Sequence, residues 1–394
     1  MTPAARAQAA IELLDEVIDA ARTAGAAADT LIARYFKTRR YAGSKDRRAV
    51  RDLVYRAIRR SGERPASGRA ALLGLVAEDP DLSALFDGSV HGPAPIGSDE
   101  RKAEAGVAPK WLEQRFDPLL DRSDLASLLE RAPLDVRVNS LRGDRAVAML
   151  AFPRATETPL SPLGIRLPEG TQVQAVPAWD KGLVEVQDEG SQLIALACAA
   201  APGMVVIDLC AGAGGKTLAL AAEMRNEGRL VAADADRGRL SRLPPRIQRA
   251  GVTIAESRLL DPGRELVALE DVAGQADIVL VDAPCSGSGT WRRNPEARWR
   301  LDENRLAKLT ALQAHLVDVA AELVRPGGAV VYAVCSLLAE EGREQAEAFG
   351  RRRSAFVSED PPIEGGRPAG PGRLLTPAHD GTDGFFVARW QAPC

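Results

Sequence analysis

Two cysteines are the residues of this chain best suited to covalent chemistry. Cys285 follows the run ADIVLVDAP at 276–284, and Cys335 lies near the end of the run AVVYAVCS at 329–336. Both runs predict buried strands, and a serine follows each cysteine. A single cysteine after a strand is more often core packing than chemistry, whereas two at corresponding strand ends favour a shared crevice. A thiolate in such a crevice could act as a nucleophile.

A thiol beside a methyl donor suits the methylation of carbon 5 of a pyrimidine. That carbon is a poor nucleophile until a thiolate adds to carbon 6, after which it can attack a sulfonium methyl group. The proton on carbon 5 must then leave and the thiol must be eliminated, and a second cysteine can assist there. Asp282, just before Cys285 in the sequence DAPC, could hydrogen-bond the amine and ring-nitrogen edge of cytosine.

A glycine-rich loop, DLCAGAGGKT at 208–217, follows another strand-like run and opens a helix. It fails two known phosphate-binding patterns: a phosphate loop needs glycine where Cys210 stands, and a dinucleotide loop needs glycine at Thr217. Its glycines do allow close backbone approach to a ligand. Asp234, which ends the next strand, offers a carboxylate to a ribose diol. This arrangement favours S-adenosylmethionine as the ligand, with a turn in some other α/β protein as the alternative.

The order of the elements explains why these residues should meet. From residue 189 onward, short β-branched runs alternate with helical ones, which predicts a doubly wound parallel α/β sheet. Ligands of such sheets bind beyond the carboxyl ends of the strands, near the topological switch point. The strands are expected at 205–210, 229–234, 253–260, 276–284 and 329–336, and the helices at 216–225, around an interruption by Pro244 and Pro245, and at 303–325.

The residues before this sheet divide into two further parts. Apolar residues recur at helical spacing from about 4 to 65, which predicts an all-helical domain. A connection rich in Gly and Pro follows at 88–109, and PLDVRVNSLRG at 133–143 alternates like a strand. We therefore expect a helical domain at 1–125, a small α+β module at 126–186 and the α/β domain at 187–394.

Composition narrows the class of protein and its partners. The chain of 394 residues carries 51 Lys plus Arg against 54 Asp plus Glu, yet residues 34–64 alone hold twelve basic and three acidic side chains. Such a segment suits a polyanion, and on charge alone a solvated helix face explains it equally well. Five scattered cysteines without a CxxC pair, and three histidines, support neither disulfides nor a metal site. Because no apolar run of about 18 residues occurs, a cytoplasmic protein is expected.

The segment TWRRNPEARWR at 290–300 combines arginines with two tryptophans shortly after Cys285. Arginine with interleaved aromatics suits phosphate contacts and stacking on an unpaired base. A structural cover over the crevice, held by ion pairs, is the alternative, and the two interpretations are compatible. A target base must leave its stack before carbon 6 can be attacked, so RNA in a loop or an opened helix is the expected substrate.

Five sequences in the same order resemble those of the Sun-type RNA (cytosine-5)-methyltransferases. DLCAGAGGKT is similar to that family's cofactor loop DxCAAPGGKT, VDAPCSGSG to DAPCSGTG, and YAVCSLLAEEG to YxTCSxxxEEN; VQDEGSQL at 186–193 and DGFFVARW at 383–390 match its flanking sequences. PLDVRVNSLRG resembles the PLxLRVNTLK segment of its small module, and the basic segment resembles a NusB-like helical domain. The resemblance covers nearly the whole chain. It implies a doubly wound, Rossmann-like α/β domain of the S-adenosylmethionine-dependent methyltransferases, preceded by a NusB-like domain.

The resemblance also implies roles for single residues. It makes Cys335 the nucleophile and Cys285 the cysteine that helps release the product, whereas DNA cytosine-5 enzymes use the cysteine of a Pro-Cys sequence, which would here be Cys285. Lys216 and Asp282 would lie near both cofactor and target base. The implied cofactor-binding residues are Cys210, Ala211, Gly212, Ala213, Gly214, Gly215, Lys216, Asp234 at the ribose, Asp261 at the adenine, and Asp282. Gly212 and Ala213 replace the family's usual Ala-Pro, which loosens a turn and removes no functional side chain.

The implied partner is RNA, and ribosomal RNA of the small subunit is the leading expectation, for a chain expected to act as a monomer without a metal. The expected RNA contacts are Arg39, Arg40, Lys45, Arg47, Arg48, Arg137, Asn139, Arg292 and Arg293. A transfer RNA cytosine-5 methyltransferase and a non-catalytic NusB-like RNA-binding factor are the alternatives. The presence of Asp234, Asp282, Cys285 and Cys335 together speaks against the second alternative.

Overall fold

The computed structural model describes residues 1–23 and 25–394, and these form two compact units. The helical unit comprises Met1–Phe116, Leu120–Arg131 and Thr290–Glu303, and the sheet unit comprises Asp117–Leu119, Ala132–Gly289 and Asn304–Cys394. The segment Thr290–Glu303 thus belongs to the helical unit, although both of its chain neighbours belong to the sheet unit. Among the described residues, no helix combines the length and the apolarity needed to cross a bilayer.

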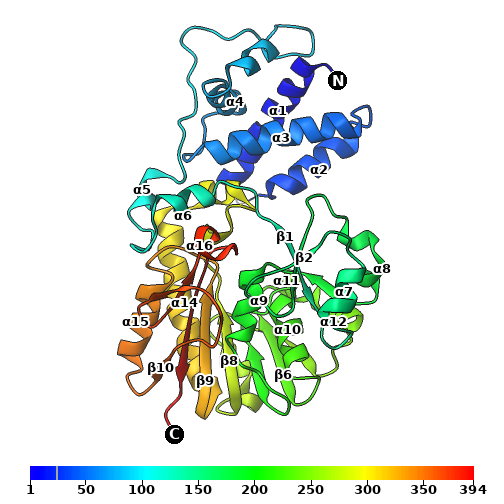
Figure 1. Ribbon diagram of the computed structural model, residues 1–394. Coiled ribbons are helices and arrows are strands. Elements are labelled where there is room, and N and C mark those ends of the chain that lie inside the picture. Colours follow the sequence, from blue (N-terminus) through cyan, green and yellow to red (C-terminus); the bar gives the residue numbers. More distant parts are fainter. Residues whose placement is uncertain (24) are drawn as a thin grey trace. The chain divides into compact units, whose positions relative to one another are not determined.

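The sheet unit is built on one large twisted sheet (Figure 1). Its strands run in the order β11-β12-β13-β9-β8-β5-β6-β7, with β10 paired to β13. The five strands from β9 to β7 are parallel, and the order switches direction at β5, which confirms the doubly wound α/β fold. The bounds of the parallel strands are β5 Val205–Asp208, β6 Arg229–Asp234, β7 Ala255–Leu259, β8 Ala276–Asp282 and β9 Val324–Val334.

One edge of this sheet is antiparallel, which the sequence did not predict. β13 (Phe385–Gln391) runs against β9, with Phe386 opposite Val334. After α15 (Arg343–Arg352) the chain returns through short strands joined by turns, and antiparallel pairing needs no crossover helix. The additional edge strands are β10 Val357–Glu359, β11 Arg367–Ala369 and β12 Gly372–Leu375.

Helices connect the parallel strands. α10 (Gly215–Glu223) follows β5, and α14 (Glu303–Leu323) precedes β9. The helix that the sequence analysis expected to be interrupted by Pro244 and Pro245 forms two short helices. The two prolines lie in the first turn of the second one, where a missing N–H costs no helical hydrogen bond. The other helices of this unit are α9 Glu189–Leu196, α11 Arg237–Leu240, α12 Leu243–Ala250, α13 Glu265–Ala268 and α16 Pro377–Asp380.

A second, smaller sheet in the sheet unit has the strand order β2-β3-β1-β4, all antiparallel. It lies between residues 134 and 186, and it has a hydrophobic core of its own that includes Val136 and Ile165. Its elements are β1 Leu134–Val138, α7 Arg145–Leu150, β2 Thr156–Glu157, β3 Gly164–Leu167, α8 Pro177–Asp180 and β4 Val184–Val186.

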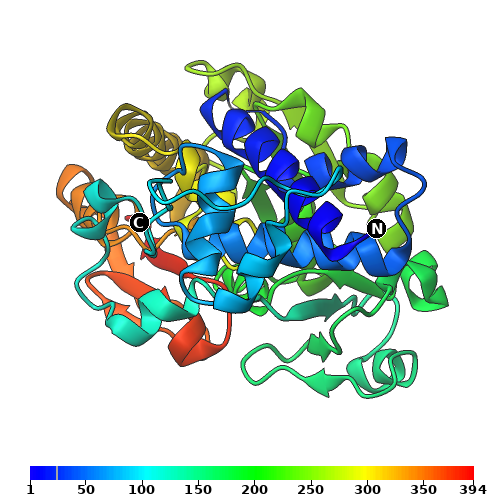
Figure 2. The same ribbon diagram turned by 90° about the horizontal axis from the view of Figure 1, so that it is seen from above.

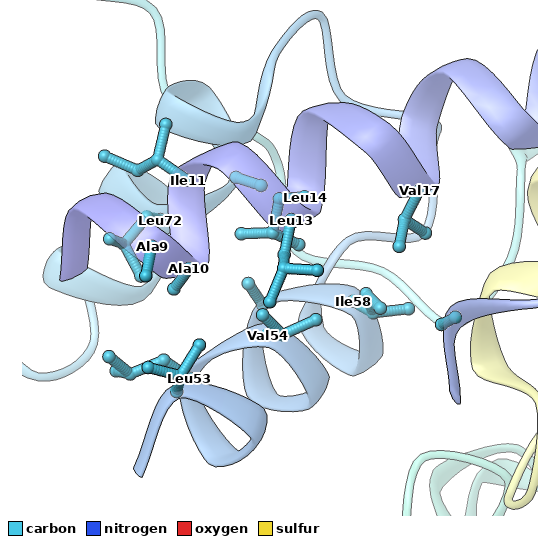
Figure 3. Close-up of a cluster of buried hydrophobic side chains, with 14 of the residues drawn as sticks. Ala9, Ala10, Ile11, Leu13, Leu14, Val17, Leu53, Val54, Ile58 and Leu72 are labelled. Carbon is cyan, nitrogen blue, oxygen red and sulfur yellow. The ribbon is translucent and has the colours of Figure 1, made fainter. Parts of the chain in front are cut away.

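In the helical unit, α1, α3 and α4 pack against one another (Figure 2). Leu13 and Leu14 of α1 face Val54 and Ile58 of α3 in the core of this unit (Figure 3). Gly68 lets α4 approach α1, because a Cβ there would lie 2.1 Å from the carbonyl oxygen of Ile11. The helices are α1 Pro3–Arg22, α2 Ala28–Thr38, α3 Ser44–Arg60, α4 Gly68–Val76, α5 Lys110–Glu113 and α6 Arg122–Ser127.

Arg298 fastens the segment Thr290–Glu303 to the rest of the helical unit. Its buried guanidinium donates to the carbonyl oxygens of Ile58 at 2.5 Å, Arg59 at 2.8 Å, Ser61 at 3.0 Å and Val107 at 2.6 Å. Burial lowers the pKa of Arg298 to about 9. Trp299 also donates to the Ser61 carbonyl, over 3.0 Å. Four charge-assisted bonds from one side chain make this arginine a structural anchor.

Candidate active site

Cys285 and Cys335 follow the carboxyl ends of two neighbouring parallel strands, β8 and β9. The pairing of the two strands extends to their ends, where the Ala283 N–H donates to the Ala333 carbonyl over 2.9 Å. The two Sγ atoms are 3.4 Å apart, and both residues are half-buried. The hydrogen bond to Cys335, together with burial, raises the pKa of Cys285 well above its usual range. Cys285 is therefore the thiol of the pair that keeps its proton.

Lys216 and Asp282 form an ion pair in the same part of the sheet unit. The Lys216 Nζ donates to the Asp282 Oδ2 over 2.6 Å. Burial alone would lower the pKa of Lys216, but the charge and the hydrogen bond of Asp282 outweigh it and raise that pKa. A negative charge on Cys335 raises the pKa of Lys216 further.

Asp208 ends β5 at the first position of the glycine loop, and its side chain is buried. One carboxylate oxygen accepts a hydrogen bond from the Thr217 hydroxyl over 2.7 Å, and the other has no partner among the described residues. Burial raises the pKa of Asp208 to about 7. An unpartnered buried oxygen of this kind is a feature that a bound cationic ligand would satisfy.

The glycine loop adopts a backbone that only glycine accommodates well at two positions. Gly212 and Gly214 have φ values of 55° and 88°, in the left-handed region. A Cβ on Gly214 would also lie 2.1 Å from a methyl carbon of Leu243. Asp234 holds the loop, because its carboxylate accepts from the Gly212 N–H at 2.7 Å and the Asp236 N–H at 2.6 Å.

A cavity of about 290 Å³ opens beside this loop. Both acidic and basic side chains line it: the acidic ones include Asp208 and Asp282, and the basic ones include Lys216 and Arg246. Such a lining, with the free oxygen of Asp208, fits the ammonium, carboxylate and sulfonium groups of S-adenosylmethionine. The lining residues are Val186, Gln187, Asp188, Ser191, Asp208, Cys210, Ala211, Ala213, Gly215, Lys216, Arg239, Arg246 and Asp282.

Some of the expected cofactor residues line the cavity and others do not. Cys210, Ala211, Ala213, Gly215, Lys216 and Asp282 line the cavity. Gly212, Gly214 and Asp234 shape the loop instead, and Asp261 is exposed just beyond β7. Sequence reasoning missed Asp188, Arg239 and Arg246, which come from three separate segments and carry no pattern that announces a shared cavity.

Several expected RNA contacts offer exposed charge. Arg40, Lys45, Arg47 and Arg48 are exposed around the start of α3. Arg39 is half-buried, with its guanidinium 3.6 Å from the centre of the Tyr35 ring and 3.5 Å from a Glu12 carboxylate oxygen. The positive surface of the helical unit that we consider for RNA is therefore the exposed set Arg40, Lys45, Arg47 and Arg48, called the basic surface from here on.

Three other expected RNA contacts are buried, which corrects the expectation that their side chains meet RNA directly. Arg137 donates to Gln187 over 2.8 Å, and burial lowers its pKa to about 10. Asn139 donates to the carbonyl oxygens of Gly182 and Ala250, both at 2.9 Å. Arg292 is 5% exposed, and Arg293 is half-buried. Trp291 and Trp299 are also buried, so neither ring is exposed for stacking on a base in this structure.

Solved structures share this fold. The protein PH0851 superposes over 99% of both chains with a TM-score of 0.77 at 22% identity. A methyltransferase homologue from Pyrococcus horikoshii matches 68% of this chain and 90% of its own, with a TM-score of 0.59 at 26% identity. The fold, the glycine loop and the charged cavity together define the Rossmann-like class of S-adenosylmethionine-dependent methyltransferases.

Sequence relatives narrow the class to a family. Residues 195–391 match the family model described as 16S rRNA methyltransferase RsmB/F. The ribosomal RNA small subunit methyltransferase B of Xylella fastidiosa is 36% identical over 71% of this chain and 68% of its own, and that of Sodalis glossinidius is 32% identical over 79% and 72%. This chain belongs to the RsmB/F family. It aligns with 66% of the length of the probable enzyme of Synechocystis and 65% of that of Salmonella typhi.

Proposed function

We propose that this chain transfers a methyl group from S-adenosylmethionine to carbon 5 of a cytosine in small-subunit ribosomal RNA. The observation that carries the proposal is the pair of sulfur atoms 3.4 Å apart at the ends of β8 and β9, with the Lys216–Asp282 ion pair in the same unit. Family membership supports a ribosomal RNA substrate. Bound S-adenosylmethionine would supply an electrophilic methyl group, held by the residues that line the charged cavity.

Cys335 is the nucleophile in this proposal. Its thiolate forms a bond to carbon 6 of cytosine, and the electron pair of the C5–C6 double bond moves toward carbon 5 and the ring nitrogen. The raised pKa keeps the proton on Cys285, which favours Cys335 as the attacking thiol of the pair, in agreement with the role that the resemblance implies. Asp282 would accept from the exocyclic amine of the target base and hold its orientation.

Cys285 takes part in the second half of the reaction. Once the Cys335 sulfur is bonded to carbon 6 it carries no negative charge, so the hydrogen bond that it accepts weakens and the part of the raised pKa of Cys285 that is due to that charge is gone. Cys285 can then ionise and accept the proton of carbon 5 after methylation. The electron pair of that C–H bond restores the C5–C6 double bond, the bond from carbon 6 to Cys335 breaks, and the proton passes to solvent.

The proposal is tested with labelled methyl groups and protein-free small-subunit ribosomal RNA. Cys335→Ala should abolish both turnover and covalent RNA adduct, whereas Cys285→Ala should let an adduct accumulate. Cys394→Ala, at an exposed thiol remote in sequence from both loops, is the matched control and should behave like the unmodified protein. Exchanged phenotypes would reverse the two roles. Label found only in transfer RNA, or in no RNA at all, would overturn the substrate or the activity.

Bisulfite mapping of ribosomal RNA from cells with and without the gene identifies the nucleotide. One cytosine should be protected only where the gene is present. If the two maps were identical, the chain would not be the methylating enzyme for that RNA.

We also propose that the basic surface of the helical unit holds the RNA. Arg40, Lys45 and Arg48 form no ion pair with another described residue, and they lie within nine residues of one another in the sequence. Phosphates neutralised by such side chains release counterions, which makes the affinity strongly dependent on salt.

A further inference from the structure

Glu341 is a buried carboxylate to which the sequence analysis assigned no role. It follows β9 by a short turn, and its side chain is fully buried. One oxygen accepts from the Ser286 N–H at 2.8 Å and from the Gln313 Nε2 at 3.0 Å. The other accepts from the Ser336 hydroxyl at 2.6 Å and from the Ser286 hydroxyl. Four donors therefore converge on one acidic side chain.

These donors belong to the two loops that carry the thiols. Ser286 directly follows Cys285, and Ser336 directly follows Cys335. Gln313 of α14, besides its bond to Glu341, donates to the carbonyl oxygen of Pro284 over 2.9 Å, on the other side of Cys285. The carboxylate thus fixes the backbone on both sides of one thiol and the residue after the other.

We propose that Glu341 is a positioning residue of the methyl transfer reaction, which sets the separation of the two thiols and, by its charge, keeps the proton on Cys285 while Cys335 attacks. This inference rests on the proposed function for its kinetic consequence. Glu341 contacts the serines beside the thiols, so its effect on the reacting sulfur atoms is exerted through those loops and through its field.

The charges around the pair are arranged asymmetrically. The pKa of Cys285 is raised by the hydrogen bond to Cys335 first, then by burial and by the charges of Cys335 and Glu341, while a hydrogen bond with the Gly287 backbone lowers it. Tyr332 stays neutral, because burial raises its pKa, and its hydroxyl donates to the Glu341 carbonyl over 2.6 Å. Lys216, paired with Asp282, supplies the positive charge that acts on Cys335.

Glu341→Gln separates charge from geometry. Glutamine can turn its carbonyl oxygen toward the two N–H donors and its amide nitrogen toward the two hydroxyls, which can rotate to accept. The variant should therefore fold with its thiols in place and without the negative charge. Glu340→Gln, in the same turn and half-buried, is the matched control.

The first measurement is alkylation of each cysteine by iodoacetamide as a function of pH, followed by mass spectrometry of the protein without RNA or cofactor. In Glu341→Gln, the midpoint of Cys285 labelling should fall by about one pH unit, the size expected when one nearby like charge is removed. Glu340→Gln should keep the midpoint. Equal midpoints for Glu341→Gln and the unmodified protein, at equal melting temperature, would overturn the role of the charge. This assay needs no methyl transfer, so it is independent of whether the proposed function holds.

The second measurement is steady-state methyl transfer. Glu341→Gln should lower kcat roughly tenfold or more and leave the KM for RNA unchanged, because misplaced reacting groups affect the chemical step. If Glu341→Gln does not fold, Ser286→Ala, which removes one hydroxyl donor and keeps the charge, takes its place. It should lower kcat with the Cys285 labelling midpoint unchanged. A kcat of Ser286→Ala equal to that of the unmodified protein, or a fall in kcat accompanied by an equal rise in the KM for RNA, would overturn the positioning role.

Discussion

The ionisation of Asp208, which lines the cavity, should make the free energy of unfolding of the sheet unit depend on pH. Its carboxyl group is 1% exposed, accepts one hydrogen bond from Thr217, and has a pKa raised by burial from 3.8 to about 7. A folded-state pKa above the unfolded one means that the folded protein holds a proton which the unfolded chain has lost. The stability contributed by that proton is complete below pH 4 and is lost as the pH rises to about 7.

The perturbation is Asp208→Asn, which keeps the shape of the side chain and removes its ionisation. Between pH 5 and the folded pKa lie about two units, which correspond to roughly 3 kcal/mol. The free energy of unfolding of the variant relative to the unmodified protein should therefore rise by that amount between pH 5 and pH 8. Hydrogen-bond changes at Thr217 are the same at both pH values and cancel in this comparison.

Urea unfolding at pH 5, 6.5 and 8, without cofactor, measures this difference. The fluorescence of Trp179 and Trp390 follows the sheet unit. Asp261→Asn, at an exposed aspartate beyond β7, is the control and should shift no curve with pH. Parallel pH profiles for Asp208→Asn and the unmodified protein would refute the reasoning, because they would mean that Asp208 ionises in the folded protein as it does in the unfolded chain.

Three further predictions concern other parts of the chain. Arg298→Met removes four hydrogen bonds to backbone carbonyl oxygens and should destabilise the helical unit by about 3 kcal/mol or more, seen as a lower Tm in circular dichroism. Lys45→Ala combined with Arg48→Ala should weaken RNA binding and reduce the slope of log affinity against log salt by up to about two; an unchanged slope would remove these residues from the RNA contact. Hydrogen peroxide should oxidise Cys285 and Cys335 to a disulfide, itself giving two waters, with activity restored by dithiothreitol; persistence of both free thiols in mass spectrometry would contradict this.

The sequence predicts the parallel part of the sheet well, because four of its five strands contain an apolar run that ends near aspartate or cysteine; β7, with Glu256, Ser257 and Arg258, is the exception. The placement of Cys285 beside Cys335 follows directly from the strand order. The antiparallel pairing of β13 with β9 does not, since an isolated apolar strand carries no sign of the direction of its neighbour.

Polar residues were harder to interpret than apolar ones. Arg137 in β1 and Asn139 directly after it alternate with valines, a pattern typical of a sheet with one face exposed to solvent. Both are nevertheless buried, and Asn139 donates to the carbonyl of Ala250, more than a hundred residues away. Glu341 shows the same difficulty. Its four donors come from three separate segments, and nothing in the local sequence AEEG distinguishes it from the half-buried Glu340 beside it.

The membership of Thr290–Glu303 in the helical unit has a consequence for any attempt to divide the protein. A shortened chain that starts at residue 132 would still carry this segment, with Trp291, Arg298 and Trp299 deprived of the carbonyl groups and apolar side chains that cover them. Such a fragment would expose apolar side chains and unpaired hydrogen-bond donors in a loop that begins five residues after Cys285. Fusions or exchanges that use this chain must therefore move residues 290–303 together with the helices before residue 132, and those helices cannot be treated as a detachable module.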